Sequence, residues 1–268
     1  MGGWFLAIRG RVPRKVGLLL GMVPILILVG LWWAATRGEV EERAIGPQIL
    51  PSPAEVVRSV PELLTQRDLV THILSSLRRV GLGYLVALAA ALPLGILMGA
   101  FGSARATLSP SATASGYIPI ATLVPLTMSW FGTGELQKII FLAMAFGIYL
   151  LPLVVAAIEH VPEVYLKTGY TLGASRWQTV RRVLIPVAMP EIWQSMRLAF
   201  GVGWTYLVLT EVVVLTDGLG YLVAISQRRG PREHIYLVIV VITLIAWAAD
   251  LVWTQIGRQV FRHMRSNP

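Results

Sequence analysis

Long apolar runs recur along this chain, and they are long enough to cross a lipid bilayer. The run at 16–35 contains no charged residue, and a spanning helix needs about 20 predominantly apolar residues. Further runs follow at 80–101, 109–131, 138–158, 191–214 and 236–256. Backbone N–H and C=O groups inside a bilayer must pair within the protein, so such runs predict α-helices. The sequence therefore predicts an all-α, polytopic membrane protein with six transmembrane helices.

The composition agrees with a membrane protein. Hydrophobic residues make up 55% of the chain and charged residues 14%, with a mean hydropathy of +0.67, whereas soluble domains average about 25% charged residues. The net charge of +9 gathers in loops, which indicates membrane topology and contact with anionic lipid, not nucleic-acid binding. The chain has no cysteine, and its four histidines lack ligand spacing. We therefore expect neither disulfides nor a metal site.

The first apolar run follows a basic segment. Four basic residues and no acidic one precede it: Arg9, Arg11, Arg14 and Lys15. Positive charge beside a span favours the cytoplasmic side, so we expect a cytoplasmic N-terminal tail at 1–15 and a retained first helix at 16–35. A cleaved secretory signal is the alternative, but its apolar core is shorter and ends in a small-residue cleavage site.

The rest of the chain divides by polarity. We expect an external segment at 36–79, a core of five transmembrane helices at 80–258 and a cytoplasmic C-terminal tail at 259–268. In the external segment, Ser52 or Pro53 begins an amphipathic helix that runs through Leu64. Both termini then lie in the cytoplasm.

Glycine and proline shape two of the predicted spans. The second span carries small-residue faces that let helix backbones approach closely, formed by Gly81, Gly83, Gly95 and Gly99. The third span, at 109–131, is interrupted by Pro110, Pro119 and Pro125. Proline at membrane depth is tolerated where neighbouring helices or a cavity satisfy the freed carbonyls. We therefore expect this span to be kinked and interior, and to line a path.

A basic polar loop at 160–186 separates two apolar spans, and its local pattern predicts two short helices around a glycine. Pro162 begins the first helix and Gly173 ends it in a left-handed conformation. Ser175 caps the second helix, with Gln178 completing a capping box. The face of this helix is formed by Trp177, Val180, Val183 and Leu184. We expect Pro186 and Pro190 to end it before the next span.

This loop resembles the EAA loop of ABC importer permeases, EAA-x3-G-x9-I-x-L-P. The matching residues are Gly173 and, after nine residues, Val183, Leu184, Ile185 and Pro186. The first three positions of the motif differ from the family pattern, because this chain has Lys167, Thr168 and Gly169 where the family has Glu, Ala and Ala. Any salt bridge of that Glu with the ATPase therefore does not carry over. Three phrases resemble the nitrate/sulfonate/taurine/bicarbonate branch of the family: ILPSPAEVV at 49–57, WFGTGELQKI at 130–139 and EVVVLTDGLG at 211–220. The resemblance covers about 49–261.

The resemblance implies the small importer-type (type I) permease fold, with a coupling helix that seats in a groove of the ATPase subunit. It assigns coupling to Thr171, Leu172, Gly173, Ala174, Ser175, Arg176, Trp177, Val183 and Pro186. The implied partners are a second permease copy forming a homodimer, two ATP-binding cassette subunits and an extracytoplasmic binding protein, in a bacterial inner membrane. This chain would bind no cofactor, since ATP and Mg belong to the ATPase. The implied solute is a small anion such as nitrate, bicarbonate, a sulfonate or taurine.

Polar residues within the spans are candidates for the translocation path. We select Pro119, Pro125, Trp204, Tyr206, Thr210 and Glu211. Ionisable groups at membrane depth usually face a partner, a cavity or the interface. Glu211 therefore either lies beside the path or pairs helices by bonding backbone or a neighbouring Ser or Thr. Arg197 either snorkels to the interface or forms an ion pair.

The sequence contains no Walker motif, no HExxH and no paired carboxylates at enzyme spacing. We therefore expect a non-catalytic subunit, with ATP hydrolysis on a separate chain, and rank an intramembrane enzyme last. The alternative function is a proton- or ion-coupled secondary transporter that uses Glu211 and Asp250, although such carriers often show two matching halves and this chain shows no internal repeat. Two other interpretations of the loop at 160–186 are an ordinary basic cytoplasmic loop and a DNA-binding helix-turn-helix, which the flanking spans disfavour.

Overall fold

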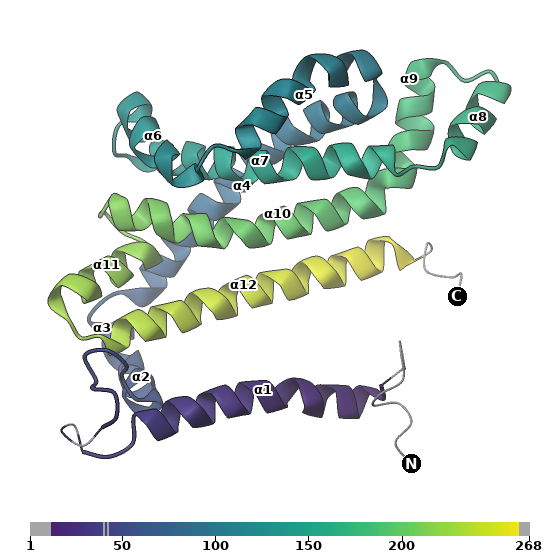
Figure 1. Cartoon of the computed structure of the whole chain (residues 1–268). Coiled ribbons are helices and arrows are strands. Elements are labelled where there is room, and N and C mark those ends of the chain that lie inside the picture. The colour runs from purple at the N-terminus through teal and green to yellow at the C-terminus, as the bar shows by residue number, and fades with distance from the viewer. Residues whose placement is uncertain (1–11, 40, 42, 263–268) are drawn as a thin grey trace. The chain divides into compact units, whose positions relative to one another are not determined.

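The computed structural model describes residues 12–262 except 40 and 42, and these residues form helices joined by turns (Figure 1). Most of the predicted cytoplasmic tails at 1–15 and 259–268 lies outside the described residues. The chain divides into two compact units. One unit comprises Met1–Arg67 and Ser226–Leu237, and the other comprises Asp68–Ile225 and Val238–Pro268.

The first unit contains helix α1 (Arg14–Ala35), which is the predicted first span, and the two short helices α2 (Pro53–Arg58) and α3 (Val60–Thr65). Ser52 caps α2 in a capping box with Glu55, as its sequence indicates. The expected single helix through Leu64 is wrong, because it is interrupted at Ser59. Pro61 is the reason: it has no N–H to donate back to Val57, and its ring disfavours a continuous helix.

Two aromatic donors hold the turn that precedes α2. The indole Nε1 of Trp32 donates to the carbonyl of Pro51 at 2.8 Å, and the hydroxyl of Tyr236 donates to the carbonyl of Ile49 at 2.7 Å. The two rings lie 6.2 Å apart between centroids. The prolines of this turn reduce its own backbone donors, so side-chain donors satisfy its carbonyls.

The second unit begins with α4 (Leu69–Ala100) and α5 (Gly102–Gly116), followed by the short η1 (Ile120–Thr122) and α6 (Leu123–Phe131). The chain continues through α7 (Glu135–Glu159), α8 (Glu163–Thr171), α9 (Arg176–Thr179), the π-helical turn η2 (Val180–Leu184) and α10 (Ile185–Val213). Helices α11 (Leu219–Arg229) and α12 (Glu233–Val260) each contribute residues to both units.

Five helical segments of the described chain are long and apolar enough to span a membrane. They are Lys15–Ala35, Leu69–Ala100, Glu135–Glu159, Arg176–Val213 and Glu233–Val260, and the shorter apolar segment Ile120–Phe131 accompanies them. These segments correspond to the six predicted spans, except that the third is not one continuous helix. The prediction of an all-α membrane protein is confirmed.

The core of the second unit lies where α4, α7 and α10 pack together. Its largest buried side chains include Tyr84, Phe141, Phe146, Trp204 and Leu207. Tyr84 meets the rings of Phe146 and Phe200 edge to face, with centroids 5.1 and 5.0 Å apart, a preferred geometry for aromatic pairs.

Glycines on α4 allow the close approach of α7. A Cβ atom built on Gly83 would lie 2.7 Å from the Cβ of Leu142, and one built on Gly99 would lie 2.6 Å from the Cβ of Ile158. Gly95 meets Val154 in the same way. The small-residue prediction is therefore confirmed for these three positions. It is wrong for Gly81, which faces open space.

The second span begins earlier than predicted. Helix α4 has 32 residues, so it is about 48 Å long at 1.5 Å per residue. The predicted boundary at Val80 placed Arg78 and Arg79 in the external segment. Arg79 instead lies within the helix and is buried, because carboxylates from three other segments surround it.

The third span is divided by a non-helical turn. Helix α5 ends at Gly116, and Pro119 precedes η1 with an extended backbone. Pro110 and Pro125 are accommodated within α5 and the first turn of α6. The expected interior position holds only for the second half. Ile120, Leu123, Val124 and Thr127 are buried, whereas α5 has no buried residue among its described positions.

The predicted stop at Pro186 and Pro190 is wrong, because helical structure continues from Arg176 to Val213. The N–H of Ile185 bonds to the carbonyl of Val180, five residues back, and this π-helical turn admits the proline that follows. The glycine-containing segment at 201–203 lies within the same helix. A Cβ on Gly203 would lie 2.0 Å from the ring of Phe146, so this glycine serves helix packing.

Candidate functional site

The polar loop has the predicted helix–glycine–helix structure. Pro162 precedes α8, and Gly173 follows it with a left-handed φ of +78°. The hydroxyl of Ser175 accepts from the backbone N–H of Gln178 at 3.3 Å, and the side chain of Gln178 accepts from the N–H of Ser175 at 2.9 Å. The capping box is therefore confirmed, and short-range interactions explain the geometry of the loop.

The predicted apolar face of the second helix is only partly correct. Val180 and Leu184 are buried and Val183 is half-buried, but Trp177 is 60% exposed. The π-helical turn has more residues per turn than the α-helix assumed for the face, and Thr179 occupies the buried position before it.

Helix α8 lies against this turn through a small residue. A Cβ on Gly169 would lie 3.7 Å from Val183 and 3.8 Å from the hydroxyl of Thr179. Lys167, which replaces the Glu of the motif, forms an exposed salt bridge with Glu163 at 2.8 Å. The hydrogen bond from Lys167 lowers the pKa of the Glu163 carboxyl below its usual value.

The outer surface of this loop carries large apolar side chains. Leu172 is 82% exposed, and Tyr170 and Trp177 are also exposed. They lie on either side of Gly173, outside the segments that can span a membrane or at their end. Neighbouring exposed apolar side chains of this size are typical of a protein-docking surface.

Glu211 lies in a buried ion network at the end of α10. Its Oε1 accepts from the hydroxyl of Ser76 at 2.8 Å and from Nη1 of Arg79 at 2.7 Å, and its Oε2 accepts from the N–H of Gly220 at 2.8 Å. Of the two interpretations of Glu211, the structure therefore favours the acid that pairs helices.

Sequence reasoning missed Arg79, the centre of this network. Its side chain is 1% exposed, and it donates to Glu135 from Nε at 2.9 Å, to Glu211 and to Asp217. Burial raises the pKa of the Asp217 carboxyl, but hydrogen bonds, chiefly from Arg79, outweigh it and hold the pKa at about 2. One signal was available: a basic residue on the side predicted to be external contradicts the positive-inside rule.

Lys138 is the second buried cation of the network and was also missed. Its Nζ lies 2.5 Å from the hydroxyl of Thr216 and 3.7 Å from Asp217. It stood at the predicted start of a span, where a lysine is usually taken to mark the membrane boundary. The network thus contains two cations and three carboxylates: Arg79, Lys138, Glu135, Glu211 and Asp217.

The same helix α4 also holds the turn after α10. The Nδ1 of His72 accepts from the N–H of Gly218, and the hydroxyl of Ser76 accepts from the N–H of Leu219, both at 2.9 Å. Gly218 has a φ of +107°, and a Cβ there would lie 2.3 Å from the carboxyl carbon of Glu211. Only glycine fits this position, so the phrase around 211–220 encodes a structural turn.

Arg197 and Asp250 form a two-pronged ion pair between α10 and α12. Nε of Arg197 lies 2.6 Å from Oδ1 of Asp250, and Nη2 lies 2.7 Å from Oδ2. The ion-pair interpretation of Arg197 therefore holds. The secondary-carrier alternative needs acidic side chains that are free to bind and release a proton or an ion. Glu211 and Asp250 are instead both paired with arginines.

Two of the six path candidates lie on one cavity. Pro119 and Tyr206 line a space of about 580 Å³, together with Tyr117 and Tyr149. The hydroxyls of Tyr149 and Tyr206 are 3.0 Å apart. No charged side chain is among the residues that line this cavity in the described part of the chain.

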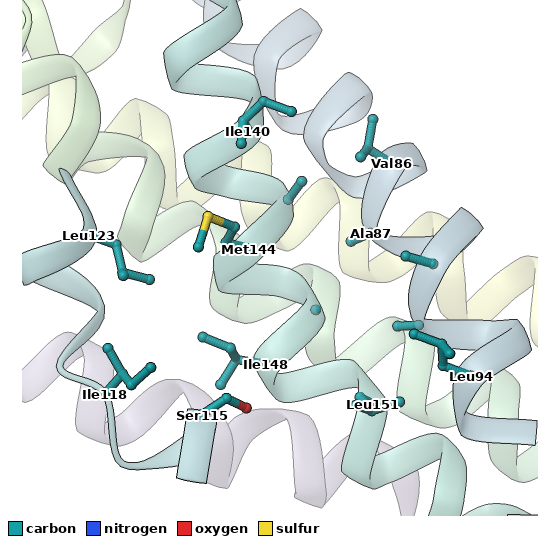
Figure 2. A pocket seen from close by; sticks show the side chains of 14 residues that line it. Val86, Ala87, Leu94, Ser115, Ile118, Leu123, Ile140, Met144, Ile148 and Leu151 are labelled. Carbon is teal, nitrogen blue, oxygen red and sulfur yellow. The ribbon is translucent and has the colours of Figure 1, made fainter. Parts of the chain in front are cut away.

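The other four path candidates lie elsewhere. Trp204 and Thr210 are buried in helix packing, Glu211 belongs to the ion network, and Pro125 lies in α6. A neighbouring cavity of about 420 Å³, which shares Ile118 and Ile148 with the first, lies between α4, α7 and the segment that leads to α6 and is almost wholly apolar (Figure 2). Ser115 has the one polar side chain among its described lining residues. An anion would find few partners there.

The helical order and the α4–α7–α10 core define a membrane permease fold. A solved structure of the inward-facing MetNI methionine ABC transporter superposes on 72% of this chain and 95% of its own, with a TM-score of 0.65 and 21% sequence identity. The chain belongs to the binding-protein-dependent transport system inner membrane component family, whose sequence profile matches residues 91–266. The resemblance seen in the sequence is confirmed.

Curated relatives support the family along almost the whole chain. The taurine transport system permease protein TauC of Escherichia coli (strain K12) is 31% identical over 91% of this chain and 88% of its own. The aliphatic sulfonates transport permease protein SsuC of Bacillus subtilis (strain 168), described as putative, is 24% identical over 97% of this chain and 93% of its own. This chain is accordingly a non-catalytic membrane subunit of an ABC importer, and nucleotide binding belongs to a separate ATPase chain.

Proposed function

We propose that this permease imports a small sulfonate such as taurine. The observation that carries the proposal is the 31% identity with a taurine permease over 91% of the chain. The resemblance to a sulfonate permease supports the same solute class. Nitrate and bicarbonate are the alternatives within this branch.

The cavity of about 580 Å³ beside Pro119 and Tyr206 is our candidate for the translocation path. Helix α5 has 15 residues before the non-helical turn at 117–119, so this turn lies about 22 Å along the helix, well inside a bilayer about 30 Å thick. Non-helical backbone at that depth is tolerated where protein buries it or a water-filled cavity adjoins it. Tyr117 is 83% exposed in the single chain, so a water-filled path or a second copy adjoins this turn.

Tyrosine hydroxyls suit the passage of a small oxyanion. Tyr149 and Tyr206 offer O–H donors to a sulfonate without a fixed opposite charge that would hold it tightly. A path without a cationic cluster binds its solute weakly, and weak binding favours release. Selection of the solute then belongs to the external binding protein.

The loop at 160–186 is our candidate for coupling to the ATPase. Its proposed contact residues are those named from the resemblance, with Leu172 and Trp177 exposed beside Gly173. Nucleotide-driven closure of two ATPase subunits would move α8 and α9 as rigid levers and switch two permease copies between inward- and outward-open states, as packed interfaces are bistable.

Coupling through this loop fixes the proposed membrane topology and the composition of the complete importer. The coupling loop, the N-terminus and the C-terminus lie in the cytoplasm, the segment at 36–79 is external, and the core extends from 80 to 258. The complete importer contains two identical permeases, two ATP-binding cassette subunits and an external binding protein in a bacterial inner membrane.

Transport by the reconstituted complex tests the solute. Proteoliposomes that contain this permease, its ATPase and its binding protein should accumulate radiolabelled taurine with ATP and not with ADP. The Tyr206→Phe variant should lower the taurine rate more than Tyr221→Phe, a control that changes a half-buried tyrosine of α11 outside the cavity and outside the coupling loop. Accumulation driven by a pH gradient without ATP would overturn the importer mechanism, and ATP-driven uptake of nitrate with no taurine uptake would overturn the solute.

A further inference from the structure

We propose that α10 and α12 form a binding site for a phospholipid with an anionic headgroup. Two cavities between these helices carry the inference, one polar and one apolar, each of about 260 Å³. They share the side chains of Trp193 and Trp253, so they adjoin one another. A polar space that opens into an apolar one matches an amphiphile, not a soluble ion.

The polar cavity offers donors for a phosphate group. Arg197 and Arg258 both line it, with Gln194 beside them. Asp250 occupies Nε and Nη2 of Arg197, which leaves Nη1 to face another acceptor. One carboxylate against two guanidinium groups leaves a net positive charge, and guanidinium groups bind phosphate oxygens in a forked geometry.

The apolar cavity continues from the polar one along both helices. On α12 its lining residues Val252 and Ala249 precede Arg258 by six and nine residues, which corresponds to about 9 and 13 Å of helix. On α10, Phe200 follows Trp193 by seven residues, about 10 Å. On both helices part of the apolar lining therefore lies deeper in the span than Arg258, in the order of a headgroup and an acyl chain.

Two tryptophans form the boundary between the cavities. Nε1 of Trp193 donates to the carbonyl of Trp253 at 3.2 Å, and the ring centroids are 4.6 Å apart. A Cβ on Gly257 would lie 2.6 Å from Nε1 of Trp193, so glycine is needed for this contact. Tryptophan is enriched at the headgroup level of membranes, which supports the depth assigned to the polar cavity.

The surroundings favour lipid as the occupant. In the single chain only 11% of the most apolar part of α12 is buried. Val252 and Ile256 are 56% and 42% exposed. Basic pockets between transmembrane helices at the cytoplasmic side bind anionic headgroups. The unbalanced positive charge selects phosphatidylglycerol over phosphatidylcholine, because the choline group would meet the arginines.

Native mass spectrometry of the purified full-length protein tests the site. With equal amounts of phosphatidylglycerol and phosphatidylcholine, we expect retention of phosphatidylglycerol. Arg258→Gln should weaken phosphatidylglycerol binding about fivefold. The matched control Arg182→Gln changes an exposed arginine outside both cavities and should leave this binding unchanged. Asp250→Asn should strengthen it, since it removes the competing carboxylate.

Two further arms separate a lipid from a free anion. Ala249→Phe fills the apolar cavity and should reduce phosphatidylglycerol retention, and inorganic phosphate at equal concentration should not displace the lipid. Equal retention of the two lipids, equal losses in the Arg258 and Arg182 variants, or displacement by inorganic phosphate would overturn the proposal. A melting temperature equal to that of the wild type verifies folding of the Arg258 variant, and Ala249→Phe provides the independent test if that variant does not fold.

Discussion

The ion network around Glu211 and the loop at 160–186 are both rich in polar residues, but they use them in opposite ways. In the network, Arg79, Lys138 and Glu211 are at most 1% exposed, and their partners lie within the same chain. In the loop, the charged residues Arg176, Arg181 and Arg182 are exposed, and so are the apolar Leu172 and Trp177.

The difference separates structural from functional polarity in this chain. Buried charges that are satisfied internally hold α4, α7 and the turn after α10 together, and nothing about them requires a solute. The loop holds its backbone with short-range caps and leaves large side chains exposed, as expected for the proposed docking surface. Substitutions should therefore affect folding in the network and coupling in the loop.

Glu211→Ala should have the largest effect on stability. It leaves Arg79 buried beside fewer carboxylates, and breaking a buried pair in this way destabilises by about 3–5 kcal/mol. Thermal unfolding in detergent should show a lower melting temperature and a lower yield of folded protein. Glu163→Ala is the control, since it breaks the exposed pair with Lys167 and should leave the melting temperature unchanged. Equal effects of the two substitutions would contradict the comparison.

Gly173→Pro should separate coupling from folding. The φ of +78° at this position is inaccessible to proline, so α8 and α9 would lose their relative orientation. We expect normal membrane insertion and a melting temperature close to that of the wild type, but no substrate-stimulated ATP hydrolysis when the variant permease is mixed with the ATPase and the binding protein. Normal stimulation in this variant would rule out the loop as the coupling element.

Ser175→Ala should have a smaller effect in the same loop. Loss of an N-cap costs about 1 kcal/mol of helix stability, so hydrogen exchange should accelerate at the first residues of α9. Gln178→Ala keeps the acceptor for the helix N–H and removes only the reciprocal bond, and it should have a weaker effect. The reverse order would show that the hydroxyl of Ser175 is not the principal cap.

The network also predicts a small dependence on acid. The folded pKa of Asp217 is about 2, below its unfolded value, so its stabilising contribution is present above pH ~4 and is lost as the pH falls towards 2. The melting temperature should not change through this group between about pH 5 and 8. Asp217→Asn should reduce the loss below about pH 4, and an unchanged acid profile would contradict the ion pair with Arg79.

Short-range patterns explain why the loop could be predicted and the network could not. The capping box joins Ser175 and Gln178, three residues apart, whereas Arg79 and Glu211 are 132 residues apart. A single sequence contains no signal that two distant charges meet, so Arg79 was assigned to an external segment. Proline positions indicated a disturbed third span, but Pro119 interrupts the helix and Pro125 does not, because only the latter lies in a first helical turn.

Quantitative pull-down from membranes in mild detergent tests the central claim most directly. The tagged wild type should retain an ATPase with a Walker motif at one copy per permease, and Gly173→Pro should lose it while remaining folded. Tyr206→Phe, a substitution outside the loop, should retain it fully. A permease that purifies without the ATPase yet accumulates solute in ATP-free vesicles with a pH gradient would contradict the account.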